Sequence, residues 1–181
     1  MAIKSTIFKA ELQITDMDRN YYADHQLIIA RHPSENDERM MVRLLAFMLN
    51  ASESLQFTKG ISTEDEPDIW QKSLSDEIEL WIDLGQPDEK RIRKACGRSR
   101  NVIICIYQQR SGKEWWDRNR NKLARFDNLS IVSFADESVA ALGRMAQRSM
   151  RLQCTIQDGQ LWITDGEQSV EIVPETFKPA K

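Results

Sequence analysis

Strict alternation of apolar and polar residues marks both ends of the chain. In residues 5–14, Phe8, Ala10, Leu12 and Ile14 occupy every second position, which predicts a strand with one buried face. The turn-rich segment TDMDRN separates it from a second strand that ends near residue 31, so the two should form a hairpin. Residues 152–173 alternate in the same way around two Asp-Gly turns, which predicts a three-stranded meander. The two terminal β elements are candidates to pair with each other.

Between these β regions the pattern alternates between helices and short strands. A helix is expected from Ser34, a good N-cap residue, to about Asn50, because Met and Leu side chains recur on one face. Strands follow at residues 55–61, 68–73 and 78–84. Pro87 is placed to open a second helix, which should end near Gly97. A buried strand over residues 102–107 should run parallel to its neighbour, because a helix separates the two.

A helix over residues 115–126, a strand over 129–134 and a helix over 138–150 complete the pattern. The middle of the chain therefore reads α-β-β-β-α-β. We predict a mixed α/β fold, with a hairpin at the N-terminus and a meander at the C-terminus, in which residues 1–181 form a single domain.

Composition narrows the functional class. The chain is 41% hydrophobic and 29% charged, which is ordinary for a globular protein. It has no apolar run near the roughly 20 residues of a membrane helix, and its N-terminus lacks the apolar block of a signal peptide. Its three cysteines form no CxxC pair, so a reduced cytoplasmic protein without a membrane partner is expected. A net charge of −3 confines any nucleic-acid contact to a local patch.

Four carboxylates carry the strongest chemical hypothesis. Asp68 begins one predicted strand, and Asp83 ends the next, with Glu79 on the same face. Glu38 is spaced to continue the apolar stripe of the first helix, although it would equally suit the dipole of a first helical turn. Clustered carboxylates suit Mg²⁺ or Mn²⁺, which would polarise a phosphate and activate water. Asp68, Asp83 and Glu79 are the predicted metal ligands.

A basic helix follows the second acid. It carries Lys90, Arg91, Arg93 and Lys94 among its cations. An ordinary solvated helix face is one interpretation, and a surface that binds DNA or RNA phosphates is the other. Gln86 precedes this helix, either as its N-cap or as a phosphate contact.

The chain resembles the YaeQ family of small bacterial proteins along nearly its full length. The stretches that carry the resemblance are ADHQLIIARHPSENDERMMVRLLAF, STEDEPDIWQK, ELWIDLGQPDEKRIRKACGR and RSMRLQCTIQDG. The resemblance implies a variation on the PD-(D/E)XK nuclease core, whose element order matches the α-β-β-β-α-β prediction. It also implies a nuclease-like site in which Pro67-Asp68 supplies the Pro-Asp element.

In the same resemblance, Asp83 matches the second acid, with Glu79 as the alternative register, and Glu38 matches the acid of the first helix. The lysine that should follow two residues after the second acid is absent: Gly85 or Trp81 stands there. Gln86 or a migrated cation would have to stabilise the developing charge in its place. The candidate cations are Lys72, Lys90 and Lys94.

Three functions remain open at the level of sequence. The first is a Mg²⁺-dependent nuclease or related phosphodiesterase that uses Asp68 and Asp83, with Glu38, Gln86 and Lys72 in support. The second is a non-catalytic adaptor on a nuclease-like scaffold, which binds nucleic acid through the basic helix or binds a protein. The third is a purely protein-interacting domain whose carboxylates are structural. Fold alone does not choose among them.

Overall fold

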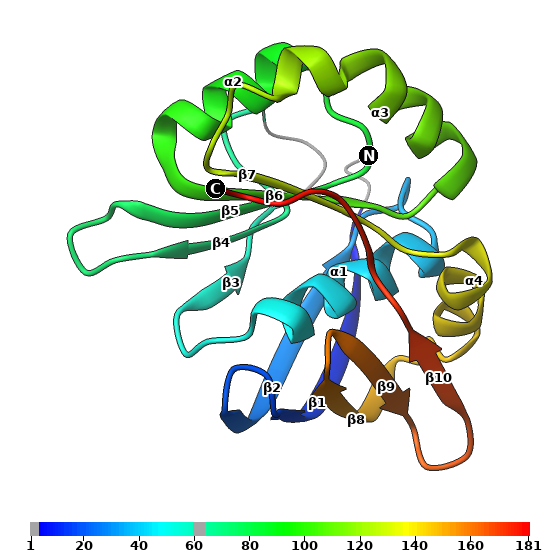
Figure 1. The fold of residues 1–181 in the computed structure, drawn as a ribbon. Coiled ribbons are helices and arrows are strands. Elements are labelled where there is room, and N and C mark those ends of the chain that lie inside the picture. The colour runs from blue at the N-terminus through cyan, green and yellow to red at the C-terminus, as the bar shows by residue number, and fades with distance from the viewer. Residues whose placement is uncertain (1–3, 60–63) are drawn as a thin grey trace. The chain divides into compact units, whose positions relative to one another are not determined.

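The computed structural model describes residues 4–59 and 64–181, and its backbone divides into two compact units (Figure 1). The first unit comprises Met1–Leu49 and Glu137–Pro174, and the second comprises Asn50–Asp136 and Glu175–Lys181. The chain therefore enters each unit twice. The prediction of a single domain stays a prediction.

The first unit is built on a five-stranded sheet with the order β10-β9-β8-β1-β2. Its strands are β1 (Thr6–Asp16), β2 (Tyr21–Arg31), β8 (Ser149–Gln157), β9 (Gln160–Thr164) and β10 (Ser169–Ile172). The predicted hairpin and meander are both confirmed, and they join through parallel pairing of β1 with β8. Asp158 and Gly159 both adopt positive φ, as a two-residue hairpin turn requires.

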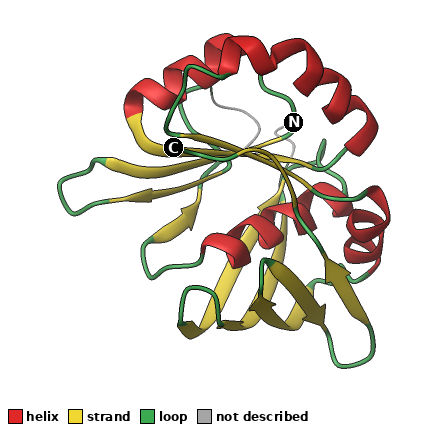
Figure 2. Ribbon diagram, in the orientation of Figure 1, coloured by secondary structure: helices red, strands yellow, loops and turns green. Residues whose placement is uncertain are grey.

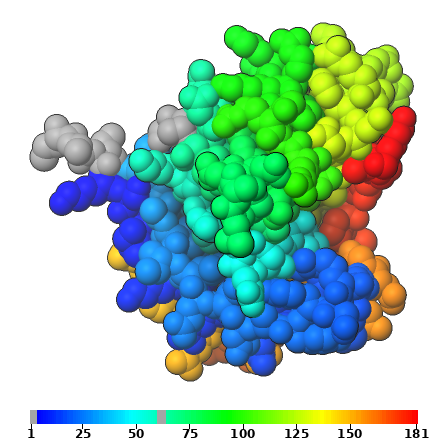
Figure 3. Space-filling model, turned by 90° about the vertical axis from the view of Figure 1, so that its left-hand side faces the viewer, coloured from blue at the N-terminus to red at the C-terminus, as the bar shows by residue number. Residues whose placement is uncertain are grey.

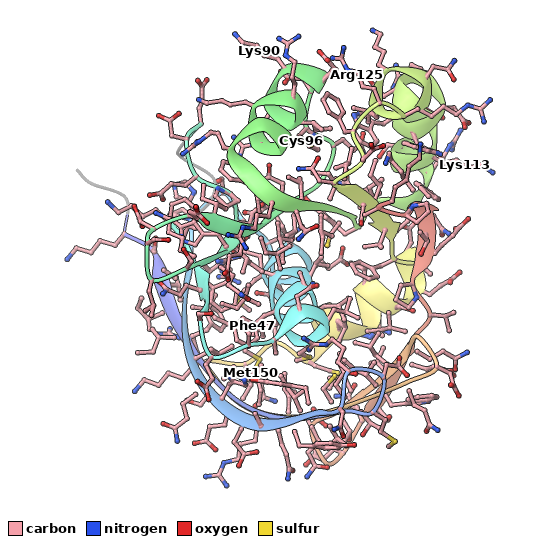
Figure 4. All side chains as sticks on the ribbon, turned by 60° about the vertical axis from the view of Figure 1, so that its left-hand side comes forward. Phe47, Lys90, Cys96, Lys113, Arg125 and Met150 are labelled. Carbon is pink, nitrogen blue, oxygen red and sulfur yellow. The ribbon has the colours of Figure 1, made fainter. Side chains whose placement is uncertain are left out.

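Two helices belong mainly to this first unit, α1 (Asp37–Asn50) and α4 (Asp136–Arg144). Phe47 of α1 and Met150 of β8 are both buried between the helix and the sheet (Figure 4). The opposite side of the sheet faces solvent, because every second residue of β1 and β8 is exposed or partly exposed. The hairpin β1–β2 forms the blue part of the surface in Figure 3.

The second unit is built on a six-stranded sheet with the order β11-β7-β6-β5-β4-β3. Its strands are β3 (Leu55–Phe57), β4 (Ile69–Lys72), β5 (Ile78–Leu84), β6 (Ser99–Ile106), β7 (Leu129–Ser133) and β11 (Glu175–Lys178). β5, β6 and β7 are parallel, as predicted for the first two, and the remaining pairs are antiparallel. Helices α2 (Glu89–Arg98) and α3 (Gln109–Leu123) cover one face of this sheet (Figures 1 and 2).

A single apolar cluster holds these helices to the sheet. Ile92 and Ala95 of α2 and Trp115 and Leu123 of α3 pack against buried Val and Ile residues of β6 and β7. The opposite side of α2 is almost entirely charged, so the helix is strongly amphipathic.

The predicted starts of two helices are wrong, because in each case a nearby residue makes the N-cap hydrogen bond instead of the predicted one. α1 begins at Asp37, since Asn36 rather than Ser34 accepts the amide of Arg39, at 2.8 Å. The Ser34 hydroxyl is instead 2.7 Å from the ring of His32. Likewise Asp88, not Gln86, caps α2 by accepting the amide of Arg91, so that Pro87 precedes the cap.

Other boundaries differ in length. α3 begins six residues before the predicted start at Trp115, and α4 ends at Arg144 rather than near Met150 because β8 begins at Ser149. The strand β11 was not predicted. The fold class is confirmed: the structure is mixed α and β with two mixed sheets, and the order α1-β3-β4-β5-α2-β6 matches the predicted α-β-β-β-α-β series.

Candidate functional site

The two predicted acids lie opposite each other on neighbouring strands. Asp68 precedes β4, and extending the pairing of Ile69 with Ile82 by one residue places it against Asp83 of β5. Its amide donates to the carbonyl of Ile82 at 3.1 Å, and its Oδ2 accepts the amide of Leu84 at 2.9 Å. Asp68 is 5% exposed and Asp83 3%. This is the carboxyl edge of the parallel strands, where open α/β sheets commonly bind ligands.

Arg91 of α2 meets Asp83 with two parallel hydrogen bonds. Its Nε donates to Oδ2 at 2.8 Å, and its Nη2 donates to Oδ1 at 3.0 Å. The indole Nε1 of Trp81 also donates to Oδ2, at 3.0 Å. Both oxygens of this buried carboxylate are therefore bound, in the bidentate geometry that makes guanidinium–carboxylate pairs strong.

The same arginine also holds the segment that leads into β4. Arg91 donates to the carbonyls of Glu64 and Glu66, at 3.2 and 3.0 Å. Two further cations of α2 reach this segment: Lys94 Nζ lies 2.5 Å from the Asp65 carboxylate, and Arg98 donates to the Asp65 carbonyl at 3.0 Å. One edge of the basic helix is thus bound to the protein itself.

The electrostatics of the site agree with this pairing. The pKa of Arg91 is raised, chiefly by its hydrogen bonds to Asp83 and against the opposing effect of partial burial. Burial raises the pKa of the Cys105 thiol to about 12, with a smaller contribution from the negative charges of Asp68 and Asp83. The cysteine beside the acids is therefore a neutral packing group rather than a nucleophile.

Glu79 does not join the two acids. Its Oε2 accepts from Gln71 Nε2 at 2.7 Å, and Gln71 Oε1 accepts from the Ser52 hydroxyl at 2.7 Å. Four residues along a strand separate Glu79 from Asp83, which corresponds to about 13 Å. One ion cannot bind both side chains at metal–oxygen distances of about 2 Å.

Glu38 belongs to the first unit, whereas Asp68 and Asp83 belong to the second. Its side chain is exposed in the first turn of α1, and its Cγ lies against Gly143 of α4, where an added methyl would come within 2.7 Å. The buried acid of this region is instead Glu35, which lies 2.6 Å from Arg39 and 2.5 Å from Arg43. The expected inward orientation of Glu38 is therefore not observed.

The predicted magnesium ligands do not fit a metal site in this conformation. Both oxygens of Asp83 are bound by Arg91 and Trp81, and Glu79 is too far along the strand. Among residues 4–59 and 64–181, no group of three or more His, Cys, Asp or Glu side chains is arranged to hold an ion. The guanidinium of Arg91 supplies the positive charge at Asp83.

The candidate replacements for the missing lysine lie elsewhere. Lys72 Nζ is 3.2 Å from Asp76 and 4.1 Å from the centroid of the Trp70 ring. Gln86 donates to the Ser111 hydroxyl at 2.7 Å. Lys94 is bound to Asp65, and Lys90 points away from the sheet (Figure 4). The cation at the acids is Arg91, which the sequence predicted as a nucleic-acid contact.

Arg91 could have been singled out from its spacing. It lies eight residues after Asp83 and one turn into a helix that returns along the same sheet, and Trp81 lies two residues before the acid on the same strand face. The buried Glu35 gave no such signal, because a Ser-Glu-Asn-Asp-Glu run contains several equally plausible first-turn acids.

Comparisons with known proteins agree along nearly the whole chain. The family model described as "YaeQ protein" matches residues 1–174. The YaeQ protein of Salmonella typhi is 48% identical over 172 residues, and that of Escherichia coli K12 is 46% identical over 172 residues. Each alignment covers 95% of both chains.

Two solved structures share the fold. The crystal structure of YaeQ from Xanthomonas axonopodis pv. citri matches with a TM-score of 0.95 and 46% identity, covering 98% of this chain and 99% of that one. YaeQ from Pseudomonas syringae matches with a TM-score of 0.92 and 32% identity, covering 97% of both. In the described part of the chain, no helix is both long and apolar enough to cross a membrane. On this evidence, the chain belongs to the YaeQ family.

Proposed function

We propose that this protein binds nucleic acid through the outer side of α2 and α3, as a non-catalytic adaptor. The observation that carries the proposal is local charge. Residues 88–127 contain twelve lysines and arginines against five aspartates and glutamates, in a chain whose net charge is −3. Ten of these twelve cations are exposed on α2, on α3 or just after α3, and such a concentration supports binding to phosphates even where the whole protein is acidic.

Nearly all of these exposed cations stand on the two neighbouring helices α2 and α3. α2 and α3 contact each other and cover the same face of the six-stranded sheet (Figure 1). Lys90, Lys113 and Arg125 point outward from this layer (Figure 4). We call the following exposed residues the basic layer: Lys90, Arg93, Lys94, Arg98, Arg110, Lys113, Arg118, Arg120, Lys122 and Arg125.

Parts of the basic layer are already neutralised, which defines where a phosphate would bind. Lys94 pairs with Asp65, and Arg125 lies 2.5 Å from Glu89. Arg93 is 3.9 Å from the same glutamate, a loose contact that leaves most of its charge to solvent. Lys90 and Lys113, which point outward, and Arg93, which is only loosely paired, are the residues chosen to test contacts with nucleic-acid phosphates.

The ion pair between Asp83 and Arg91 supports a structural role for Asp83. It fixes α2 to the end of β5 and to the Glu64–Glu66 carbonyls, so the basic layer has a rigid base. Cleavage that used Asp83 as a metal ligand would require the metal to compete with Arg91, because both oxygens of the acid already accept hydrogen bonds. A firmly held basic helix beside an acid that is already paired favours binding of nucleic acid over its hydrolysis.

The test is fluorescence anisotropy with short labelled DNA and RNA, single- and double-stranded, over a series of salt concentrations. A Lys90→Ala, Arg93→Ala, Lys113→Ala variant is compared with a matched variant, Lys4→Ala, Lys59→Ala, Arg144→Ala, which removes three exposed cations outside the layer. We expect the first variant to bind more weakly. The negative slope of its log K against log salt should be shallower than that of the wild type by about 2 to 3. The second should behave like the wild type.

Equal losses in both variants, or binding that does not respond to salt, would exclude the basic layer as the site. The same nucleic acids incubated with Mg²⁺ or Mn²⁺ test the nuclease alternative. Cleavage that disappears in both Asp68→Ala and Asp83→Ala would replace the adaptor proposal by metal-dependent hydrolysis.

A further inference from the structure

One edge of the five-stranded sheet is a long strand with a single neighbour. β2 spans eleven residues and, in the described part of the chain, pairs with β1 alone. The strands at the other sheet edges, β3, β10 and β11, are only three or four residues long. Short edge strands are one way in which proteins prevent pairing with another chain, and β2 does not use it.

Other features that protect an edge are also missing from β2. Its register with β1 is unbroken over the whole strand, so no bulge twists the edge away. The strand contains neither proline nor lysine, and its only carboxylate and guanidinium are those of Asp24 and Arg31. Figure 3 shows the hairpin that contains it, in blue, at the surface. β2 is therefore open to pairing with a further strand.

The direction of each backbone group of β2 follows from the contacts of β1. Lys9 and Met17 donate their amides toward β8, so the even-numbered residues of β1 face β2. These lie opposite the odd-numbered residues of β2, which leaves the even-numbered residues of β2 to face outward. The carbonyl of Ala30 agrees with this direction, because it accepts from Arg43 of α1 at 3.1 Å. We call the outward-facing residues without a backbone partner in the described chain the free edge: Tyr22, Asp24, Gln26 and Ile28.

The free edge is symmetric about His25. Tyr22 lies three residues before His25 and Ile28 three residues after it. Both are large apolar side chains on the same face of the sheet, 59% and 69% exposed. Two β2 strands that run antiparallel around a twofold axis at His25 would place Tyr22 of each copy opposite Ile28 of the other, a pairing type that stabilises sheets. Asp24 would lie opposite Gln26, a carboxylate facing an amide donor.

Neighbouring registers fit less well. An axis at Asp24 would place that carboxylate opposite its own copy, and like charges directly opposite each other are destabilising. An axis at Gln26 would pair Tyr22 with Ala30, whose carbonyl is already bound to α1. Only the axis at His25 pairs all four residues of the free edge with one another, which allows about eight backbone hydrogen bonds between the copies.

We propose that this protein forms a homodimer in which two β2 strands pair antiparallel about His25, so that the five-stranded sheets of two copies become one continuous sheet. The occupant is a second copy because the free edge is complementary to itself in charge, in apolar side chains and in backbone groups. A strand of another protein would need none of that symmetry. The interface lies in the first unit and the basic layer in the second, so this inference does not depend on nucleic-acid binding.

Hydrogen exchange of backbone amides, measured by NMR on the full chain at low and high protein concentration, tests the pairing directly. Amides of the free edge should exchange rapidly in the monomer and become protected in the dimer. Amides of Ala23, His25 and Leu27 face β1 and are the internal control, protected at both concentrations. Sedimentation velocity measures the dimer itself. A chain that stays monomeric at high concentration, or protection that rises without this alternation, overturns the proposal.

A matched pair of substitutions locates the interface. Ile28→Lys places a charge opposite Tyr22 of the other copy and should weaken dimerisation about tenfold, because symmetry repeats the change. Ile7→Lys makes the same change on the same face of the sheet, but on β1, which has neighbours on both sides, and should leave the dimer intact. Both positions are exposed, so the monomers should unfold at the wild-type temperature. Dimerisation of Ile28→Lys as strong as in the wild type, or equal losses in both variants, overturns the proposal.

Oxidative cross-linking tests the register. Opposite Cα atoms of a hydrogen-bonded antiparallel pair are about 5.5 Å apart, a distance that suits a disulfide. The double variant Tyr22→Cys, Ile28→Cys should form a cross-linked dimer that a reducing agent separates. Ile28→Cys alone should not, because the residue opposite it is then Tyr22. Absence of the cross-link in the double variant, or an equal cross-link in Ile28→Cys alone, overturns the axis at His25 and with it the proposed dimer.

Discussion

Arg91→Ala is the sharpest test of the acid site, because it removes the partner of a buried charge. Asp83 is 3% exposed and would keep the hydrogen bond that the indole Nε1 of Trp81 donates to it at 3.0 Å. Removing one member of a buried ion pair typically costs 3–5 kcal/mol, since the remaining charge is uncompensated. The Arg91 side chain is 28% exposed, which allows water to approach the acid once the guanidinium has gone. We therefore expect a loss of about 3 kcal/mol in the free energy of unfolding.

Urea unfolding measures this loss, with circular dichroism for the helices and tryptophan fluorescence for the core of the second unit. Lys90→Ala is the matched control, because Lys90 neighbours Arg91 on the same helix but is exposed and points outward. It should change stability by less than about 0.5 kcal/mol. For a chain of this length, a loss of 3 kcal/mol corresponds to a melting temperature lower by about 6–12 °C.

A double-mutant cycle with Asp83→Asn separates the ion pair from other contacts of the arginine. The amide removes the buried charge, so Asp83→Asn with Arg91→Ala should be more stable than Arg91→Ala alone. The interaction free energy should be about 1–3 kcal/mol. Additive effects of the two substitutions, or an Arg91→Ala loss no larger than that of Lys90→Ala, would show that the ion pair does not stabilise the fold.

Three further predictions concern glycines, a helix cap and a cysteine. Gly112→Ala should destabilise the protein by about 1–3 kcal/mol, because the added methyl would lie 2.1 Å from a branched side chain of β6. In Gly97→Ala the added methyl meets nothing within 4 Å, so this variant should be neutral or stabilising, and the melting temperatures of the two variants test the difference. Asn36→Ala should lower the free energy of unfolding in urea by about 1 kcal/mol, and Ser34→Ala by much less. A larger loss in Ser34→Ala would instead support Ser34 as the N-cap of α1. Burial raises the pKa of Cys96 to about 11, so its alkylation should be about a hundredfold slower than that of a free thiol at pH 8 and should accelerate as pH rises toward 11; equal rates in the folded and unfolded protein would contradict this.

Periodicity predicted the elements of this fold better than their ends. β5 was predicted at residues 78–84 and has those bounds, because its alternation is uninterrupted and both of its neighbours in the sheet are strands of the same unit. Helix starts failed where several capping residues compete within one turn, as at Ser34 and Asn36. The choice between Ser34 and Asn36 depends on which side chain already has another hydrogen-bond partner, as Ser34 has in His32. The pattern of residues along the chain does not show this. β11 was missed because it is four residues long and pairs with β7, more than 40 residues away.

The candidate site divides in the same way. Pairing of Asp68 with Asp83 followed from strand order and alternation, both of which are local. The partner of Asp83 did not, because it depends on how α2 is rotated about its axis after the Gly85 turn, whose φ is +97°. A rotation of one residue, about 100°, would have brought Lys90 or Ile92 to the acid instead. Apolar packing of Ile92 and Ala95 fixes that rotation and so selects Arg91.

The guanidinium of Arg91 and a divalent cation would compete for the same carboxylate of Asp83. Arg91 has the advantage because the packing of α2 holds it beside the acid. A metal that binds Asp83 must first displace Arg91 from both carboxylate oxygens, and the free energy of that displacement is subtracted from the free energy of metal binding. Loss of the arginine would also release the carbonyls of Glu64 and Glu66, so metal binding would loosen the segment that leads into β4. The contacts of Asp83 in this chain are therefore explained without hydrolysis. Asp83 anchors the cationic helix α2, and Arg91 of that helix in turn neutralises Asp83.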